Sequence, residues 1–164
     1  MPVGSALPWL LLRSLRSPDP ASNAWARVAD RYKLAEKLIH HPGLILFGEI
    51  FGNNTDMPYG VRQDITGSDF LVFDAYSSGC GRFVDHAYLE DICEVLGLPM
   101  VPVLKRLVWG KDSFESLLPL AEGNTTLDAD HVREGFVVKS AIEPHIGRII
   151  LKMAGEGYYT RKGA

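Results

Sequence analysis

Four short stretches decide the fold of this chain: FGEIFG at residues 47–52, FLVFDAY at 70–76, EGFVVK at 134–139 and ILKM at 150–153. Each stretch consists mainly of aliphatic and aromatic residues, which is typical of a β-strand. Each also contains a charged or aromatic residue that stands out from its neighbours. Because a charged group inside an apolar strand is costly unless it is paired, the four stretches indicate a polar site built on separate strands.

Helices are expected between these strands, at about residues 22–41, 85–97 and 112–120. Ser22 or Asn23 can cap the first helix, Asp85 can cap the second, and Asp112 with Glu115 has the spacing of a capping box. A further short strand is expected at 100–104. Strands separated by helices of uneven length, with no repeated βαβ spacing, favour an α+β fold over a doubly wound sheet.

The 164 residues are enough for one compact domain, which we expect at residues 22–164. Residues 1–21 contain four prolines and no sustained period, so they are expected to be an irregular lead-in. The longest apolar run near the start, residues 6–12, is too short to span a bilayer and lacks the charged region of a signal peptide. We therefore expect a soluble cytoplasmic protein that does not bind membranes.

The charge and cysteine content exclude several function classes. A net charge of −3 argues against a protein that coats nucleic acid, so phosphate contacts must come from local basic clusters such as Lys105-Arg106. Cys80 and Cys93 have no metal-ligand spacing. The sequence also contains no glycine-rich phosphate loop, serine elbow or dinucleotide fingerprint.

Glu49 and Phe73 each admit two interpretations. Glu49 is either a buried, paired carboxylate that organises the fold, or a carboxylate that accepts from a ribose hydroxyl or holds a metal. The glycines on both sides of it would allow a ligand to approach the backbone. Phe73, taken alone, is typical of a core aromatic residue rather than a platform on which a base stacks.

Glu134 and Lys152 also admit two interpretations. Glu134 and Lys139 bracket a short apolar strand, either as the polar ends of an edge strand or as site residues. Mg²⁺ binds through one or two carboxylates together with substrate phosphates, a requirement that Glu134 and Glu49 meet. Lys152 either faces solvent in mid-strand or provides a fixed cation next to a phosphate.

In this order, the four stretches resemble the nucleotidyltransferase motifs of covalent polynucleotide ligases, and most closely those of phage-type RNA ligases. The resemblance covers roughly residues 22–164 and implies an adenylyltransferase domain of antiparallel sheets flanked by helices. It implies catalytic roles for Glu49, Glu134 and Lys152, metal binding by Glu134, and nucleotide binding by Phe73, Glu49, Lys139 and Lys152. In the family, the phenylalanine that matches Phe73 stacks on the adenine.

The resemblance implies an enzyme that uses ATP and Mg²⁺ or Mn²⁺ to seal RNA ends or nicked duplexes. A lysine attacks the α-phosphate of ATP, the AMP passes to a 5′-phosphate, and a 3′-hydroxyl then displaces it. The family lysine lies in a Lys-x-Asp/His-Gly motif upstream of the stretch that contains Glu49. The lysines before Glu49 here are Lys33 and Lys37, and both fall in the predicted first helix.

We therefore expect an N-terminally truncated adenylyltransferase domain that cannot form lysyl-AMP alone. A separate segment that carries the lysine motif is an expected partner. Two alternatives remain open from the sequence: a DNA ligase or capping-type nucleotidyltransferase, and a non-catalytic remnant that binds nucleotide or RNA. Substrate preference distinguishes the first alternative from an RNA ligase. The second alternative should bind ATP without forming a covalent adduct.

Overall fold

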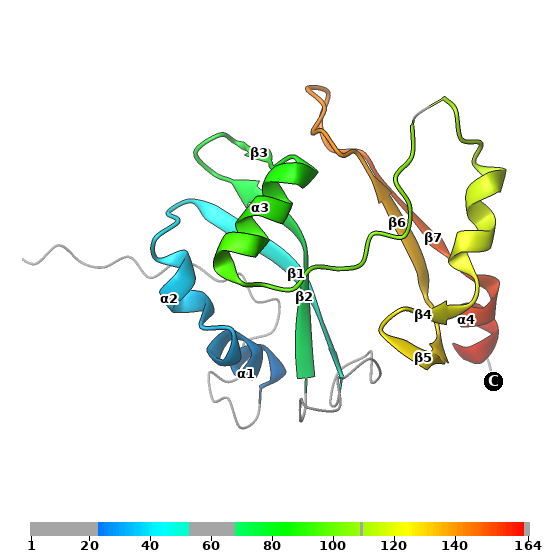
Figure 1. Cartoon of the computed structure of the whole chain (residues 1–164), viewed down its shortest axis with the longest axis horizontal. Coiled ribbons are helices and arrows are strands. Elements are labelled where there is room, and N and C mark those ends of the chain that lie inside the picture. Colours follow the sequence, from blue (N-terminus) through cyan, green and yellow to red (C-terminus); the bar gives the residue numbers. More distant parts are fainter. Residues whose placement is uncertain (1–22, 53–67, 109, 163–164) are drawn as a thin grey trace, which may run out of the picture.

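The described part of the chain is an α+β fold, as predicted from the sequence. The computed structural model describes residues 23–52, 68–108 and 110–162. The lead-in expected at residues 1–21 lies outside these ranges. Within them, small antiparallel sheets alternate with helices along the chain (Figure 1).

The strands form three sheets in the described residues. The first sheet has the order β1 (Leu44–Gly52), β2 (Ser68–Ser77) and β3 (Arg82–Phe83). The other two are two-stranded and antiparallel, and they pair β4 (Asn124–Thr125) with β5 (Asp128–Val132) and β6 (Gly135–Lys139) with β7 (Ile150–Ala154). The helices are α1 (Ala24–Arg31), α2 (Leu34–Leu38), α3 (His86–Leu96), α4 (Glu156–Lys162) and the 3₁₀ helix η1 (Glu115–Ala121).

The first predicted helix is two helices in the structure. Asn23 caps α1 as expected, because its side-chain oxygen accepts from the backbone N–H groups of Trp25 and Ala26. The helical path then breaks at Lys33, which adopts a left-handed conformation with φ of 51°. The prediction of one continuous helix over 22–41 is therefore wrong, since residues other than Gly, Asn and Asp rarely adopt this conformation and the sequence gives no sign of it.

The second and third predicted helices have different outcomes. α3 follows Asp85 and ends at Gly97, whose φ of 58° is the left-handed cap expected there. The third helix is only a 3₁₀ helix that starts at Glu115. Asp112 does not form the predicted capping box; it accepts instead from Lys105 Nζ at 3.0 Å and from the N–H of Val108. The strand expected at 100–104 is reduced to one bridge between Met100 and Val72.

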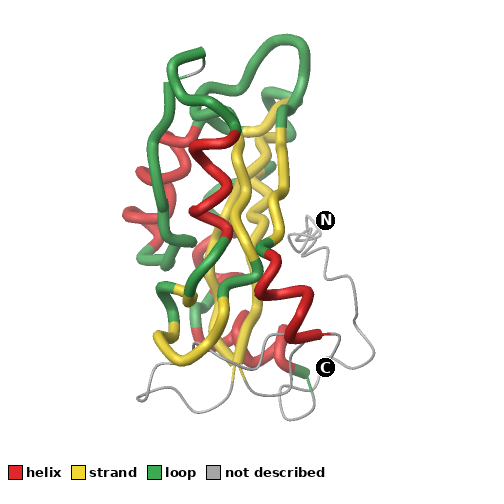
Figure 2. The backbone as a smooth tube through the Cα atoms, turned by 90° about the vertical axis from the view of Figure 1, so that its right-hand side faces the viewer, coloured by secondary structure: helices red, strands yellow, loops and turns green. Residues whose placement is uncertain are grey.

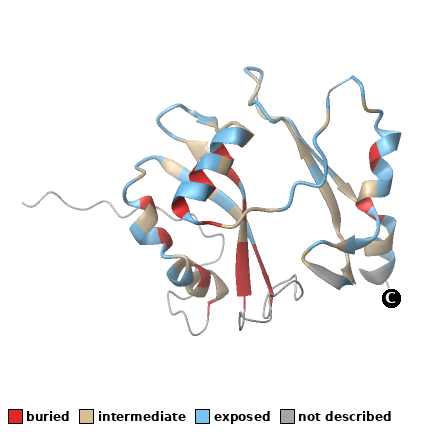
Figure 3. Ribbon diagram, in the orientation of Figure 1, coloured by how far each residue is buried: buried red, intermediate tan, exposed pale blue. Residues whose placement is uncertain are grey.

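The main hydrophobic core lies between β1–β2 and the helices α1, α2 and α3. Figure 3 shows the buried residues concentrated in this half of the molecule. The core consists of Val28, Leu34, Leu38, Ile50, Phe70, Val72, Ala75, Leu89, Ile92, Cys93, Leu96 and Leu98. Because side chains alternate between the two faces of a strand, burial of Ile50 beneath the helices directs Glu49 to the other face of the sheet.

A β-bulge interrupts this alternation in the first sheet. Phe47 pairs with Asp74 and Gly48 pairs with Val72, so Phe73 is left without a partner residue on β1. The bulge changes the direction of the side chains around Phe73 and Asp74. In the side view of Figure 2 the long strands lie roughly along one axis, and loops lie at their upper end.

Candidate functional site

Asp74 is a buried carboxylate held by two cations from the other half of the chain. It is 2% exposed and pairs directly with the guanidinium of Arg148. Lys139 Nζ lies 3.6 Å from its Oδ1 atom, and the backbone N–H of Ala75 donates to the same oxygen at 2.9 Å. A buried charge with this number of partners fixes the position of the chain segments that supply them.

Lys139 connects β6 to the bulge of β2. Its Nζ donates to the carbonyl oxygen of Phe73 at 2.6 Å. Burial lowers the pKa of the Lys139 ammonium, while the nearby Glu143 carboxylate acts in the opposite direction. The described contacts of this lysine therefore hold Phe73 and Asp74 in place.

Arg148 is a residue of this region that the sequence prediction missed. Its Nη1 donates to Glu143 Oε2 at 2.8 Å, and its guanidinium carbon lies 4.1 Å from the centroid of the Phe83 ring. Burial lowers the pKa of the guanidinium. The available signal was an arginine immediately before the apolar run at 149–151, matched by the acidic residue Asp74 in another apolar strand.

Phe73 is partly exposed rather than buried in the core. Its side chain is 37% exposed, because Phe73 alternates with the buried residues Val72 and Asp74 and faces away from the core. The interpretation of Phe73 as a core aromatic residue is therefore wrong. A ring with an exposed face, on a backbone fixed by Lys139, has what base stacking requires.

Lys152 and Glu134 form a direct ion pair. Lys152 Nζ lies 2.6 Å from Glu134 Oε1, and the two side chains are 60% and 31% exposed. The hydrogen bond to Glu134 is the largest cause of a raised pKa for Lys152, and the charges of Glu134, Tyr158 and Glu49 act in the same direction. Glu49 on β1 is thus close enough to Lys152 on β7 to affect the pKa of the Lys152 ammonium.

Both Glu49 and Lys152 are exposed, so the interpretation of Glu49 as a buried carboxylate is wrong, whereas Lys152 faces solvent as one of its two interpretations stated. Glu49 is exposed, although the apolar residues around it suggested a buried carboxylate. Lys152 is also mostly exposed. The apolar neighbours on each strand are divided between the two faces of a thin sheet, so the sequence overstated how enclosed the charged positions are.

The candidate residues therefore form two groups joined by β6. Glu134 comes just before β6 and pairs with Lys152, which lies opposite Val137 at the middle of that strand, whereas Lys139 at the far end of β6 contacts Phe73 and Asp74. Glu49 lies opposite Leu71 on β2, two residues from Phe73. Five residue steps of a strand separate Glu134 from Lys139, or roughly 16 Å. This distance is the length of β6, and Glu49 and Lys152 both lie between its two ends.

The carboxylates suit a metal ion that is shared with a ligand. No group of three or more His, Cys, Asp or Glu side chains with metal-binding geometry occurs in residues 23–52, 68–108 and 110–162. Glu134 and Glu49 offer one or two oxygen donors near the Lys152 ammonium. This donor set fits Mg²⁺ or Mn²⁺, which retain waters and complete their coordination with phosphate oxygens.

Helix length bears on membrane insertion. Within the described ranges, every helix is too short or too polar to cross a lipid bilayer.

Comparisons with known proteins place the fold. Solved structures of an RNA ligase from Naegleria gruberi are similar to this chain: the complex with PPi has 25% sequence identity and a TM-score of 0.73 over 88% of this chain. Structures of variants of that ligase, one with ATP and Mn and one with AMP and Mn, each have 26% identity and a TM-score of 0.73 over 87% of this chain.

The match is extensive for this chain and partial for the relatives. The chain spans 42% of the length of these Naegleria structures. No curated protein sequence matches the chain. A profile of the family described as RNA ligase matches residues 11–154, which is most of the sequence. The chain therefore belongs to the RNA ligase family.

Proposed function

We propose that this chain provides the nucleotide-holding part of an ATP-dependent RNA ligase that joins 5′-phosphate and 3′-hydroxyl RNA ends. The observation that carries the proposal is the convergence of Glu134 and Glu49 around the Lys152 ammonium, from three different strands or strand ends. Family membership and the Naegleria structures with ATP and Mn support the same ligand and a divalent metal.

Lys152 is proposed to contact the α-phosphate of ATP. Its ammonium is fixed by Glu134 at 2.6 Å and its pKa is raised, so it stays charged at neutral pH. A fixed cation next to a phosphate stabilises the negative charge that develops during transfer of the nucleotidyl group. Most of the Lys152 side chain is exposed, which leaves the ammonium open to such a ligand.

Phe73 is proposed to stack on the adenine, with Lys139 positioning it through the backbone. Glu49 lies opposite Leu71, two residues from Phe73, and is close enough to Lys152 to affect its pKa, so a nucleotide that stacks on Phe73 can extend its phosphates toward Lys152. Glu134 is the proposed metal ligand, with Glu49 as a second donor or an acceptor from a ribose hydroxyl. The metal would neutralise phosphate charge that the protein alone leaves exposed.

The covalent step needs a group that this sequence does not show. No lysine among the 164 residues lies in a Lys-x-Asp/His-Gly motif. We propose that the chain alone binds ATP without forming lysyl-AMP, and that a segment carrying this motif completes the site. The free thiols of Cys80 and Cys93 are compatible with a reducing compartment, and we place the reaction in the cytoplasm.

Calorimetry and labelling test the proposal together. The purified chain should bind ATP in the presence of Mg²⁺ or Mn²⁺, and Glu134→Gln should weaken the metal-dependent part of this binding by about tenfold or more. Incubation with radiolabelled ATP should give no covalent adduct. Absence of ATP binding would overturn the proposed function.

Addition of the missing motif is the second arm of the experiment. A polypeptide with the Lys-x-Asp/His-Gly segment, supplied separately or fused before residue 22, should restore covalent labelling and the sealing of a nicked RNA duplex. A lysine-linked adduct on the unsupplemented chain would show that the proposed dependence on a second segment is wrong. Preference for a nicked DNA duplex would favour a DNA ligase instead.

A further inference from the structure

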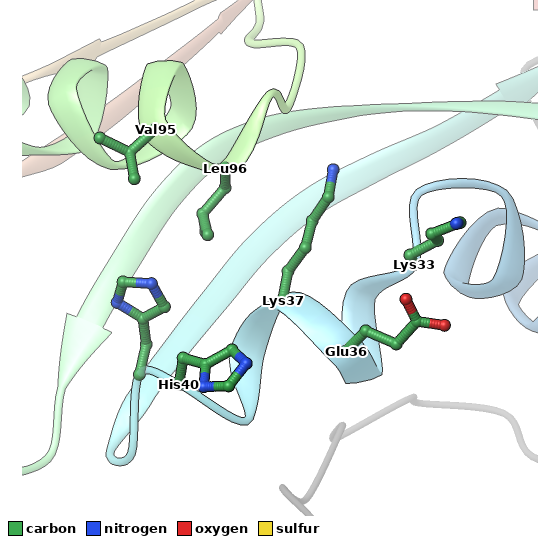
Figure 4. Close-up of a pocket in the computed structure, with 7 residues that line it drawn as sticks. Lys33, Glu36, Lys37, His40, Val95 and Leu96 are labelled. Atoms are coloured by element: carbon green, nitrogen blue, oxygen red, sulfur yellow. The ribbon is translucent and has the colours of Figure 1, made fainter.

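A second polar site lies on the far side of the first sheet from Glu49. A hollow of about 460 Å³ opens between α2 and the end of α3 (Figure 4). Lys33, Glu36, Lys37, His40 and His41 line it on the α2 side. The helices pack on the face of β1–β2 that buries Ile50, so this hollow is separate from the candidate nucleotide site.

The basic side chains of this hollow have no hydrogen-bond or ion-pair partner among the described residues. Lys33, Lys37, His40 and His41 make no side-chain hydrogen bond or ion pair with any residue in 23–52, 68–108 and 110–162. Most other cations in these ranges are engaged, as Lys105 is with Asp112 and Arg106 with Glu90. Open cations gathered in one hollow indicate an anionic ligand.

The acidic side chains near the hollow do not neutralise it. Glu36 is the carboxylate among its lining residues, against the ammonium groups of Lys33 and Lys37. The last turn of α3 contributes Val95 and Leu96, and Val95 is 76% exposed. An apolar patch beside open cations suits a ligand with both phosphates and sugar or base surface.

The backbone at the hollow is held in an unfavourable conformation. Lys33 is the non-glycine residue with positive φ in the described ranges, at 51°. Such a conformation is unfavourable in free energy for a residue such as lysine, and strained residues cluster at binding sites. The strain directs the start of α2, from which Lys37 extends toward the end of α3, as Figure 4 shows.

We infer that this hollow binds the phosphate backbone of the RNA substrate, through Lys33 and Lys37, outside the nucleotide site. The inference rests on the proposed function, because it assigns a contact surface to the substrate of the same enzyme. Binding through phosphates is independent of base sequence and weakens as salt rises. An overall charge of −3 makes such a local cluster necessary for contact with a polyanion.

Fluorescence anisotropy with a labelled, 5′-phosphorylated nicked RNA duplex tests the inference on the full chain. Lys33→Asn and Lys37→Gln should each weaken binding roughly threefold to tenfold and lower the slope of log affinity against log salt by about one. Asn tolerates the left-handed conformation of residue 33, so the first variant preserves the fold. Lys37→Arg retains the charge and should bind like the unchanged chain.

The matched control is Lys111→Gln. Lys111 is exposed and makes no side-chain contact in the described residues, and its replacement changes the net charge by the same amount. If Lys111→Gln weakens RNA binding as much as the hollow variants do, general charge explains the effect and the inference is overturned. Equal affinities and salt slopes for all chains overturn it as well.

A structural role for Lys37 predicts a different result. A Cβ atom at Gly97 would lie 3.9 Å from Lys37 Nζ, so the ammonium is near the negative end of the α3 dipole. Loss of thermal stability in Lys37→Gln together with unchanged RNA affinity would assign it to the fold and overturn the inference. ATP affinity, measured on the same variants, should stay unchanged. If the chain without substitutions binds ATP but does not bind RNA, the inference is overturned while the proposed function stands.

Discussion

Phe73 and Asp74 are neighbouring residues in opposite environments, next to the bulge of β2. Phe73 is 37% exposed, whereas Asp74 is 2% exposed and paired with Arg148. A regular strand would also place the two side chains on opposite faces, but the extra residue breaks the register at this point. The ring is thus presented outward while the carboxylate anchors β2 to the second half of the chain.

At the residue scale, the sequence predicted that charged residues are paired better than it predicted which side chains are buried. The lysine in ILKM needed an acidic partner, and the structure supplies Glu134 at 2.6 Å. The pairing of Asp74 with Arg148 was missed, because its only sequence signal is one charged residue at each of two apolar runs that lie 74 positions apart. The exposure of Glu49 was also missed, since alternation on a two-faced strand does not say which face is covered.

Lys152→Ala should impair nucleotide binding with little effect on stability. Loss of one charge-assisted contact to a phosphate corresponds to about 1.5–3 kcal/mol, or roughly tenfold to a hundredfold in ATP affinity. The ion pair with Glu134 is largely exposed, so its loss should change the free energy of unfolding by at most about 1 kcal/mol. Calorimetric titration and urea denaturation measure the two effects.

Lys105→Ala is the matched control for this change. Lys105 also forms an exposed ion pair, at 3.0 Å, and its partner Asp112 is not one of the candidate-site residues. It should affect ATP affinity very little. Equal losses of ATP affinity in the two variants would remove Lys152 from the nucleotide site.

At the element scale, long apolar runs predicted strands well and local propensity predicted helix limits poorly. β1, β2 and α3 lie where the sequence placed them, because each has a continuous apolar pattern and clear terminal residues. The break at Lys33 and the reduction of the third helix to η1 depend on tertiary contacts. Pro119 within η1 also removes a backbone donor that a longer α-helix would need.

Gly135→Ala should weaken the β6–β7 pair. Gly135 has a φ of 150°, and a Cβ atom added there would collide with the backbone oxygen of Met153 on β7. Backbone cannot move aside as a flexible side chain can, so we expect a loss of about 2–4 kcal/mol in the free energy of unfolding. ATP affinity should fall too, since Glu134 and Lys152 depend on this pairing.

Gly79→Ala provides the comparison, measured by the same denaturation experiment. A Cβ atom at Gly79 meets no other atom within 4 Å, and its φ is not in the left-handed region. The free energy of unfolding should change by no more than about 0.5 kcal/mol. A tolerated Gly135→Ala would mean that β6 and β7 do not approach as closely as described.

The start of α3 should make stability depend on pH through His86. Burial lowers the pKa of this imidazole from 6.5, although Glu90 acts in the opposite direction. Its Nδ1 atom is buried and has no hydrogen-bond partner among the residues that the structure describes. The folded state therefore binds fewer protons than the unfolded state near this pH. The stabilisation is present above about pH 6.5 and is lost as the pH falls through the lowered folded pKa.

Urea denaturation between pH 8 and pH 5, on the chain and on His86→Gln, measures this contribution. The free energy of unfolding of the unchanged chain should fall more steeply toward pH 5 than that of the variant. The difference between the two curves isolates His86 from carboxylates that titrate in both proteins. Parallel curves would show that His86 is protonated as easily in the folded state as in the unfolded state.

At the scale of the whole molecule, stability is distributed unevenly. Every member of the main core lies between residues 28 and 98. In the described residues after 110, the buried apolar side chains are Leu117 and Ala121, and β6–β7 carries exposed apolar residues such as Val137 and Leu151. The halves are joined mainly by polar contacts, among them Lys139 to Phe73 and the N–H of Glu143 to Asp85.

Nucleotide binding should therefore order the second half more than the first. Without ATP, backbone amides of β6 and β7 should exchange hydrogen faster than those of β2, because fewer buried contacts oppose their opening. ATP at a hundred times its dissociation constant adds about 2.7 kcal/mol to the stability of the bound form. Since the proposed ligand contacts lie on both halves, ATP with Mg²⁺ should slow exchange in β6 and β7 the most.

Hydrogen exchange followed by mass spectrometry measures this, with Lys152→Ala as the control in which the slowing is reduced. Amides of β6 and β7 that are as protected as those of β2 before ATP is added would show that the two halves form one cooperative unit without the nucleotide.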